Sequence, residues 1–209
     1  MPRRVAINLV LAAALAFASP AHALEAHVTE IRVAGGTLRA AIEVRDLFPE
    51  KFRSVLEQGG AIHLRLQLEL WESRPVWDRL AQPALVSVFR ILLDPATRLV
   101  SITDQFGEIS RQPAWQEPLV LRLDLGRPEA LSDSARYYVR TLSTLGTLVD
   151  KDPATAALGG DEGTVSLGAM ARGIFRAVLE VSDYMQSVSA DVRTRLLTGR
   201  ELKAGAKLQ

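Results

Sequence analysis

The stretch Ala61 to Trp71 reads AIHLRLQLELW, and this run predicts the class of the fold. Leucine or isoleucine stands at every second position, and histidine, arginine, glutamine or glutamate stands between them. Successive side chains of a β-strand point to opposite faces, so strict alternation predicts a strand with one buried face and one solvated face. We therefore expect a sheet that packs one side on an apolar core.

The sequence before this run predicts a hairpin and a short helix. Residues 37–45 alternate in the same way, and Gly35-Gly36 separates them from a further strand at residues 27–33. Glycine tolerates positive φ, so this pair is a hairpin signal. Between the hairpin and the long strand, Phe48-Pro49-Glu50-Lys51 opens a helix that Gly59-Gly60 closes in the C-cap position. We expect this helix to cover one end of the core.

The sequence after Trp71 predicts more strands. Residues 84–93 and 98–103 flank Asp94-Pro95-Ala96-Thr97, a tight-turn sequence in which proline presets φ. Residues 119–125 alternate, and residues 135–142 are predicted to form a further strand. Short alternating strands separated by turns favour a mainly β fold, either an antiparallel sandwich or a partly closed barrel. The sequence leaves these two architectures open.

The C-terminal part has a different pattern. Residues 146–165 are rich in glycine, threonine, alanine and aspartate and are typical of a flexible connection. From residue 166 to 198, apolar residues recur every three or four positions, which predicts a long amphipathic helix. They are Ile174, Val178, Val181, Met185, Val188, Val192 and Leu196. The last residues, 199–209, are predicted to be a polar, frayed tail that follows the strand-rich domain of residues 24–145.

The N-terminus resembles a secretory signal peptide. Arg3 and Arg4 precede about fourteen mostly apolar residues, followed by Ser19-Pro20 and the small residues on either side of His22. At a rise of roughly 1.5 Å per residue, such a helix is too short for a hydrocarbon core of roughly 30 Å. We expect cleavage between Ala23 and Leu24, a periplasmic or secreted product, and no integral membrane span after processing.

Composition excludes several classes of function. The formal net charge is +1, and the loss of Arg3 and Arg4 on processing would make it about −1. A nucleic-acid-binding surface requires a clustered basic excess, which the chain lacks. The chain has no cysteine, so disulfides, thiol nucleophiles and thiolate metal sites are excluded.

Few residues are candidates for a catalytic or metal-binding site. The mature chain offers only His27 and His63 as histidine bases, and we expect His63 to be a solvated strand residue. Glu25 is the one carboxylate close to His27, which is too few ligands for a metal. Four loop acids lack the spacing of a calcium loop: Asp150, Asp152, Asp161 and Glu162. We expect no catalytic residues, no metal and no cofactor.

The segment LWESRPVWDR, residues 70–79, is rich in tryptophan and arginine, residue types that are common in protein interfaces. It places Trp71, Arg74, Trp77 and Arg79 on an excursion between strands, and tryptophan and arginine are frequent in binding hot spots. We expect these four residues to contact a partner. A plainer interpretation is that the tryptophans cover a sheet edge or barrel end with the arginines stacked over them.

Three stretches resemble a known family. They are LEQGG (residues 56–60) before the long strand, ELWESRPVW (69–77), and VFRILLDPATR (88–98). They are similar to domain-of-unknown-function family 4390 of exported bacterial proteins, over roughly residues 27–145. That family has a tyrosine-asparagine turn where this chain has Asp94-Pro95. The resemblance implies an exported, strand-rich fold and a weak link to envelope signalling, and it implies no catalytic residues.

Three classes of function follow as expectations. The first is a non-enzymatic periplasmic binding or accessory module that engages an envelope protein through the tryptophan excursion or the C-terminal helix. The alternative is a carrier of a hydrophobic ligand or lipid, which requires a cavity lined by Leu64, Leu66, Leu121 and Leu123. A hydrolase that uses acids from separate strands is third. The sequence does not indicate the oligomeric state.

Overall fold

The computed structural model describes residues 24–148 and 184–208. The predicted signal peptide lies outside the described residues. So do residues 149–165 of the predicted connection, with their four acids, the first part of the predicted helix up to residue 183, and Gln209.

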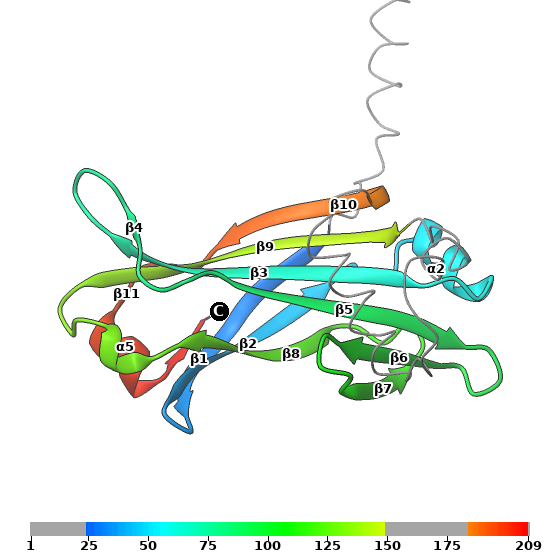
Figure 1. The fold of residues 1–209 in the computed structure, drawn as a ribbon, viewed down its shortest axis with the longest axis horizontal. Helices are drawn as coiled ribbons and strands as arrows, with labels where there is room; N and C mark the ends of the chain where they lie inside the picture. Colours follow the sequence, from blue (N-terminus) through cyan, green and yellow to red (C-terminus); the bar gives the residue numbers. More distant parts are fainter. Residues whose placement is uncertain (1–23, 149–183, 209) are drawn as a thin grey trace, which may run out of the picture.

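The described chain is built mainly of strands (Figure 1). In chain order the elements are β1 (Glu25–Ala34), β2 (Thr37–Arg45), α2 (Glu50–Glu57), β3 (Ile62–Ser73), β4 (Arg79–Leu80), β5 (Leu85–Asp94), β6 (Leu99–Asp104), β7 (Ile109–Pro113), β8 (Leu119–Gly126), the 3-10 turn η1 (Pro128–Ala130), β9 (Arg136–Leu148), β10 (Tyr184–Arg193), β11 (Leu197–Thr198), α5 (Gly199–Ala204) and β12 (Ala206–Lys207). No helix in this part of the chain is long and apolar enough to cross a membrane.

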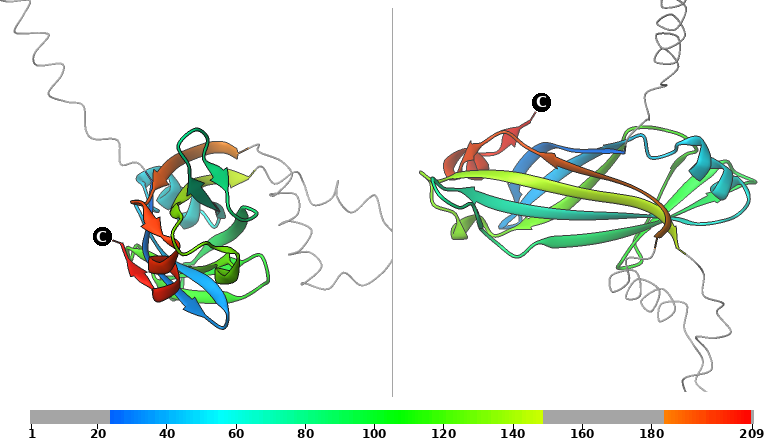
Figure 2. Two further views of the ribbon diagram at one scale, coloured as in Figure 1. Left: turned by 90° about the vertical axis from the view of Figure 1, so that its left-hand side faces the viewer. Right: turned by 90° about the horizontal axis from the view of Figure 1, so that it is seen from above.

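The strands form two antiparallel sheets, as expected for a β-sandwich. The smaller sheet has the order β12-β1-β2-β8, and the larger has the order β10-β9-β3-β5-β6-β7. Short strands β11 and β4 pair with β9 and β3 at the margins of the larger sheet. Strands β1 and β2 run diagonally across β3 and β9, and both sheets are visible as layers from the side (Figure 2).

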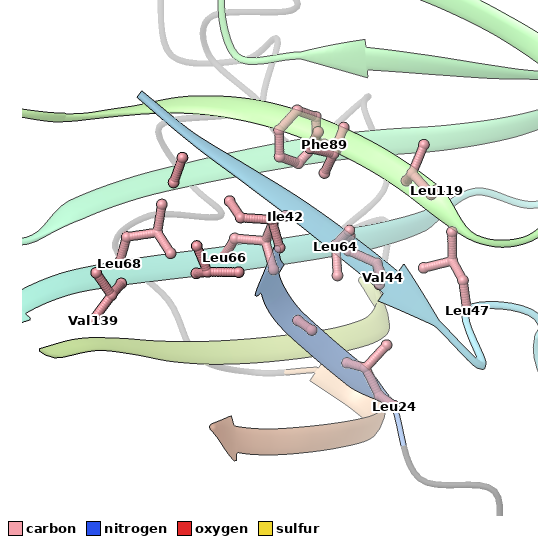
Figure 3. Close-up of a cluster of buried hydrophobic side chains, with 14 of the residues drawn as sticks. Leu24, Ile42, Val44, Leu47, Leu64, Leu66, Leu68, Phe89, Leu119 and Val139 are labelled. Atoms are coloured by element: carbon pink, nitrogen blue, oxygen red, sulfur yellow. The ribbon is translucent and has the colours of Figure 1, made fainter. Parts of the chain in front are cut away.

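Strand β3 is the centre of the core, as its sequence predicts. Its alternate residues, from Ile62 to Leu70, are all buried and face the smaller sheet. In Figure 3, Leu64 and Leu66 point toward Ile42 and Val44 of β2. The opposite face is more covered than the sequence predicts, because His63 and Glu69 are also buried.

Both predicted hairpins are confirmed. Strand β1 pairs with β2 from Glu25↔Arg45 to Ala34↔Thr37, across two glycines that have positive φ. Strand β5 pairs with β6 across the predicted proline turn, where the Asp94 side chain accepts hydrogen bonds from the Ala96 amide and the Thr97 hydroxyl. These turns are set by local sequence, which is why they could be predicted.

The predicted short helix is also confirmed. Helix α2 buries Phe52 and Leu56. At its C-terminus, Gly59 has a φ of 81°, and its N–H donates to the Leu56 carbonyl while the Gly60 N–H donates to the Val55 carbonyl. This pair of bonds is a Schellman motif, which requires a residue that tolerates positive φ.

The predicted long C-terminal amphipathic helix is wrong. Residues 184–193, inside the predicted range, form strand β10, which pairs with β9 from Tyr184↔Leu148 to Arg193↔Arg140. Side chains from Val188 to Arg193 alternate between half-buried and exposed, the pattern of a strand. The helix prediction failed because residues four positions apart, such as Val188 and Val192, share a face in a helix and in a strand alike.

Residues 199–208 also differ from the predicted frayed tail. Helix α5 begins with a capping box, in which the Thr198 hydroxyl accepts from the Glu201 amide and the Glu201 carboxylate accepts from the Thr198 amide. Leu202 and Leu208 are buried, and β12 pairs with β1. This segment therefore packs on the core, and β12 is an edge strand of the smaller sheet.

Candidate functional site

The tryptophan segment forms a short β-arm at one end of the larger sheet. Strand β3 continues to Ser73, the chain turns through residues 74–78, and β4 returns with Trp71 opposite Leu80 and Glu72 opposite Arg79. We call residues 71–80 the arm. It projects beyond the rest of the sheet in Figure 1.

One carboxylate holds both predicted arginines. Glu72 accepts from Arg74 Nε at 3.0 Å and Nη2 at 3.1 Å, and from Arg79 Nη2 at 2.8 Å. The hydrogen bond from Arg74, together with that from Arg79, lowers the pKa of Glu72 and keeps it ionised. Neither arginine is stacked over a tryptophan as the plainer interpretation supposed; instead both link the outgoing and returning sides of the arm.

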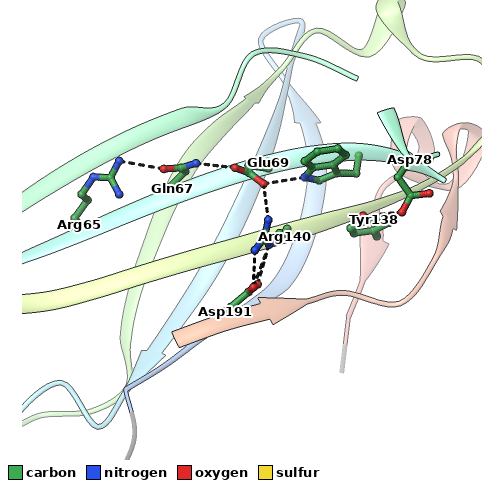
Figure 4. Close-up of polar contacts among 8 residues, drawn as sticks. Arg65, Gln67, Glu69, Asp78, Tyr138, Arg140 and Asp191 are labelled. Carbon is green, nitrogen blue, oxygen red and sulfur yellow. Dashed lines mark hydrogen bonds and ion pairs between the residues drawn. The ribbon is translucent and has the colours of Figure 1, made fainter. Parts of the chain in front are cut away.

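A second carboxylate ties the arm to β9. Asp78 accepts from the Arg74 backbone amide at 3.1 Å and from the Tyr138 hydroxyl at 2.9 Å. These two bonds lower the pKa of Asp78. Burial, followed by the bond to Asp78, raises the pKa of Tyr138. The turn of the arm is thus anchored to the body of the sandwich (Figure 4).

Trp71 belongs to a polar network on the outer face of the larger sheet. Its indole N–H donates to Glu69 at 2.9 Å, and Glu69 lies 3.5 Å from Arg140 of β9. Arg140 in turn lies 2.7 Å from Asp191 of β10, and this contact lowers the pKa of Asp191. Figure 4 shows this row of contacts continuing along β3 to Arg65. The network fixes the base of the arm by joining three strands.

The tip of the arm is apolar and exposed. Val76 is 77% exposed and Trp77 is 81% exposed, although both side chains are apolar. The braced carboxylates lie on either side of this tip in the sequence, at Glu72 and Asp78. The hydrogen-bonded arm thus presents two apolar side chains, Val76 and Trp77, that are not buried against the rest of the protein.

The four predicted contact residues therefore have different positions. Trp71 lies within β3 and is half-buried, whereas the sequence analysis placed it on the excursion. Arg74 and Arg79 brace the arm, and only Trp77 is free at the tip. The contribution of Tyr138 was missed because it comes from β9, sixty positions away in the chain from Asp78, and no local pattern signals it.

The two histidines lie apart from the arm. His27 is on the exposed face of β1, 3.2 Å from Glu25, and His63 is buried on β3 rather than solvated as expected. Within residues 24–148 and 184–208, no three His, Cys, Asp or Glu side chains come close enough together to hold a metal ion.

Three of the leucines proposed to line a carrier cavity, Leu64, Leu66 and Leu121, belong to the core, and Leu123 packs against it. Leu64 and Leu66 are fully buried in the packed core. Leu121 and Leu123 border a cleft of about 90 Å³ beside Phe106, well below the roughly 300–1,000 Å³ that ligand pockets occupy.

No protein-family model matches the chain, and no curated protein or solved structure matches it at a significant level. The resemblance to domain-of-unknown-function family 4390 therefore stays a prediction.

Proposed function

We propose that this protein is a non-enzymatic binding module of the bacterial envelope, and that the arm inserts its tip into an apolar site on a partner protein. The observation that carries the proposal is the exposure of Val76 and Trp77 at the end of a braced arm. Tryptophan is among the residues that contribute most binding energy in protein interfaces. An exposed tryptophan that the fold does not use is therefore a candidate anchor.

The bracing of the arm supports this function. Ordering a loop on binding costs free energy, and a loop that is already ordered avoids that cost. The bonds to Glu72 and Asp78 hold the turn before any partner arrives. The arm thus combines an apolar anchor with a preorganised support.

The carrier alternative has less support from the arrangement of side chains. Leu64 and Leu66 pack against the opposite sheet, and side chains fill the space that a hydrophobic ligand would need. We therefore do not propose lipid transport.

The experiment that tests the proposal is a partner capture followed by an affinity measurement. Export is examined first, by cell fractionation and by sequencing the N-terminus of the processed chain. The mature protein then captures its partner from the envelope of the native cell by crosslinking, and the purified pair is measured by calorimetry. We expect Trp77→Ala to weaken binding by at least about tenfold, as loss of a hot spot does.

Phe106→Ala is the matched control, since Phe106 is 82% exposed on the β6–β7 turn, away from the arm. Its affinity should equal that of the unchanged protein. A partner that binds Trp77→Ala and the unchanged protein equally would show that the arm is not the contact.

A further inference from the structure

A second candidate site lies between the edges of the two sheets. It is a groove of about 530 Å³, within the roughly 300–1,000 Å³ typical of ligand sites. One wall is the first half of β1, from Glu25 to Thr29, and the other is the end of β10 with the following turn, residues 192–195. Lys207 and Leu208, beside β12, also line it.

The β1 wall offers free backbone groups. Strand β12 pairs with β1 only at Glu30 and Ile31, and one further bond runs from the Leu208 amide to the Thr29 carbonyl. In the part of the chain that the structure describes, no strand pairs with Glu25–Val28 on that side. Such an edge accepts an added strand, because its N–H and C=O groups point outward in a row.

The side chains that line the groove are apolar on its inner side and mostly charged elsewhere. Val28, Val192 and the buried Leu208 give the inner side an apolar character. Basic side chains are more numerous than acidic ones in the lining: they are Arg45, Arg193, Arg195 and Lys207, against Glu25 and Glu43.

The two acids of the groove have partners of their own. Glu25 lies 3.2 Å from His27, and Glu43 lies 3.3 Å from Arg45. Among the described side chains, no carboxylate lies within ion-pair distance of Lys207. Arg195 lies 3.6 Å from Glu201 and donates a hydrogen bond of 3.3 Å to the Leu196 carbonyl. Arg45 is paired with Glu43, and the Arg193 guanidinium lies 5.6 Å from the centre of the Tyr138 ring. The positive charges of Arg195 and Lys207 are therefore the ones available to a ligand.

We propose that this groove binds an extended peptide segment by β-strand addition to β1, in line with β12. The segment's inward side chains are apolar and its outward side chains are acidic. At about 3.4 Å per residue, the free edge from Glu25 to Val28 accommodates about 14 Å of strand. This site is separate from the arm and does not depend on the function proposed for it.

The test uses a fluorescein-labelled peptide of alternating valine and glutamate, long enough to span the free edge, and measures binding by fluorescence anisotropy. Two further peptides are compared with it: one is N-methylated at alternate amides, and one has lysine in place of glutamate. We expect the acidic peptide to bind, and both altered peptides to lose about tenfold or more in affinity. Hydrogen exchange should show new protection at the alternate amides of residues 25–28 that point away from β2.

Protein variants localise the binding. Arg195→Gln with Lys207→Gln should weaken the acidic peptide by about tenfold. Arg111→Gln with Arg122→Gln, two exposed arginines outside the groove, is the matched control and should change nothing. Trp77→Ala should also bind the peptide normally, so a failure of the arm proposal is distinguishable from a failure of this one.

Three outcomes overturn the proposal. Equal binding of the N-methylated peptide means that backbone pairing is not used, and equal binding of the lysine peptide means that the acidic preference is wrong. Absence of binding by the acidic peptide at millimolar concentration means that the edge is not a strand acceptor.

Discussion

The two tryptophans of the arm have opposite roles at the scale of the residue. Trp71 donates a hydrogen bond to the buried Glu69, whereas Trp77 makes no contact of this kind in the described structure and is 81% exposed. Loss of a hydrogen bond to a charged group costs about 1.5–3 kcal/mol, and a surface substitution usually changes stability by less than about 0.5 kcal/mol.

We therefore expect Trp71→Phe to lower the free energy of unfolding by about 1.5–3 kcal/mol and Trp77→Ala to leave it almost unchanged. Urea denaturation followed by circular dichroism measures both variants. The assignment of roles is wrong if Trp77→Ala proves the more destabilising of the two.

Acid should release the arm before it unfolds the sandwich. Hydrogen bonds hold the pKa values of Glu72 and Asp78 below their ordinary values of 4.5 and 3.8. A carboxyl group whose pKa is lowered by folding stabilises the folded state above its unfolded pKa, and this stabilisation is lost as the pH falls through the folded pKa. The contribution is thus complete at neutral pH and disappears in the acid range below these ordinary values.

Limited proteolysis by pepsin during acidification measures this release. We expect cleavage within residues 74–78 to appear before the core unfolds. In Asp78→Asn, the tie to Tyr138 no longer titrates, so the pH dependence of arm cleavage should be reduced. An arm that resists cleavage until global unfolding contradicts the bracing by carboxylates.

At the scale of the element, the C-terminal segment is a structural part of the sandwich. Gly199 begins α5 where its N–H bonds to the Ala135 carbonyl, and a Cβ at this position would collide with the carbonyl oxygen of Ser132. Lys203 adds bonds of 2.7 Å to both the Leu131 carbonyl and Asp133. The segment is fixed by close approach of the backbone and by burial of leucines.

We expect Gly199→Ala to destabilise the protein by about 1–3 kcal/mol, since overpacking of a close contact costs about that much. Arg200→Ala, at the next and exposed position, is the control and should cost less than about 0.5 kcal/mol. Thermal unfolding of the two variants measures the difference. Equal melting temperatures would mean that α5 is not docked against residues 131–135, the segment between η1 and β9.

The elements also show which parts of the fold could be predicted. The hairpins at Gly35-Gly36 and at Asp94-Pro95 were predicted because turn residues lie beside alternating strands. Strand β10 was predicted as a helix because its pairing partner β9 is distant in sequence. Residues four positions apart share a face in a helix and in a strand, so their spacing alone did not distinguish the two. The α5 capping box, Thr198 to Glu201, is by contrast a local signal for the start of a helix.

At the scale of the whole molecule, stability depends on one core between two sheets. Leu66 is fully buried at the centre of β3, and its neighbours come from both sheets. Removal of a buried leucine side chain costs about 2–5 kcal/mol. We expect Leu66→Ala to lower the free energy of unfolding by this amount.

Val120→Ala is the control for this core prediction, because Val120 is 50% exposed on β8 and should cost about 0.5 kcal/mol or less. Urea denaturation distinguishes the two. A small effect of Leu66→Ala would mean that the sheets do not pack densely, and would favour the carrier alternative.

The candidate site was predicted in composition but not in geometry. The sequence singled out Trp71, Arg74, Trp77 and Arg79, yet it could not separate bracing residues from the exposed tip. That separation depends on Tyr138 and Arg140, which long-range pairing of β9 with β3 places beside the arm. Local patterns do not contain this information.

The most direct test of the central claim is photocrosslinking in the native cell. A photoreactive phenylalanine analogue is placed singly at position 77, at position 71 and at position 106. The binding-module account predicts a defined protein adduct from position 77 and none from positions 71 and 106. An adduct from position 106 without one from position 77 would contradict it, since the arm tip would then not be the surface that meets the partner.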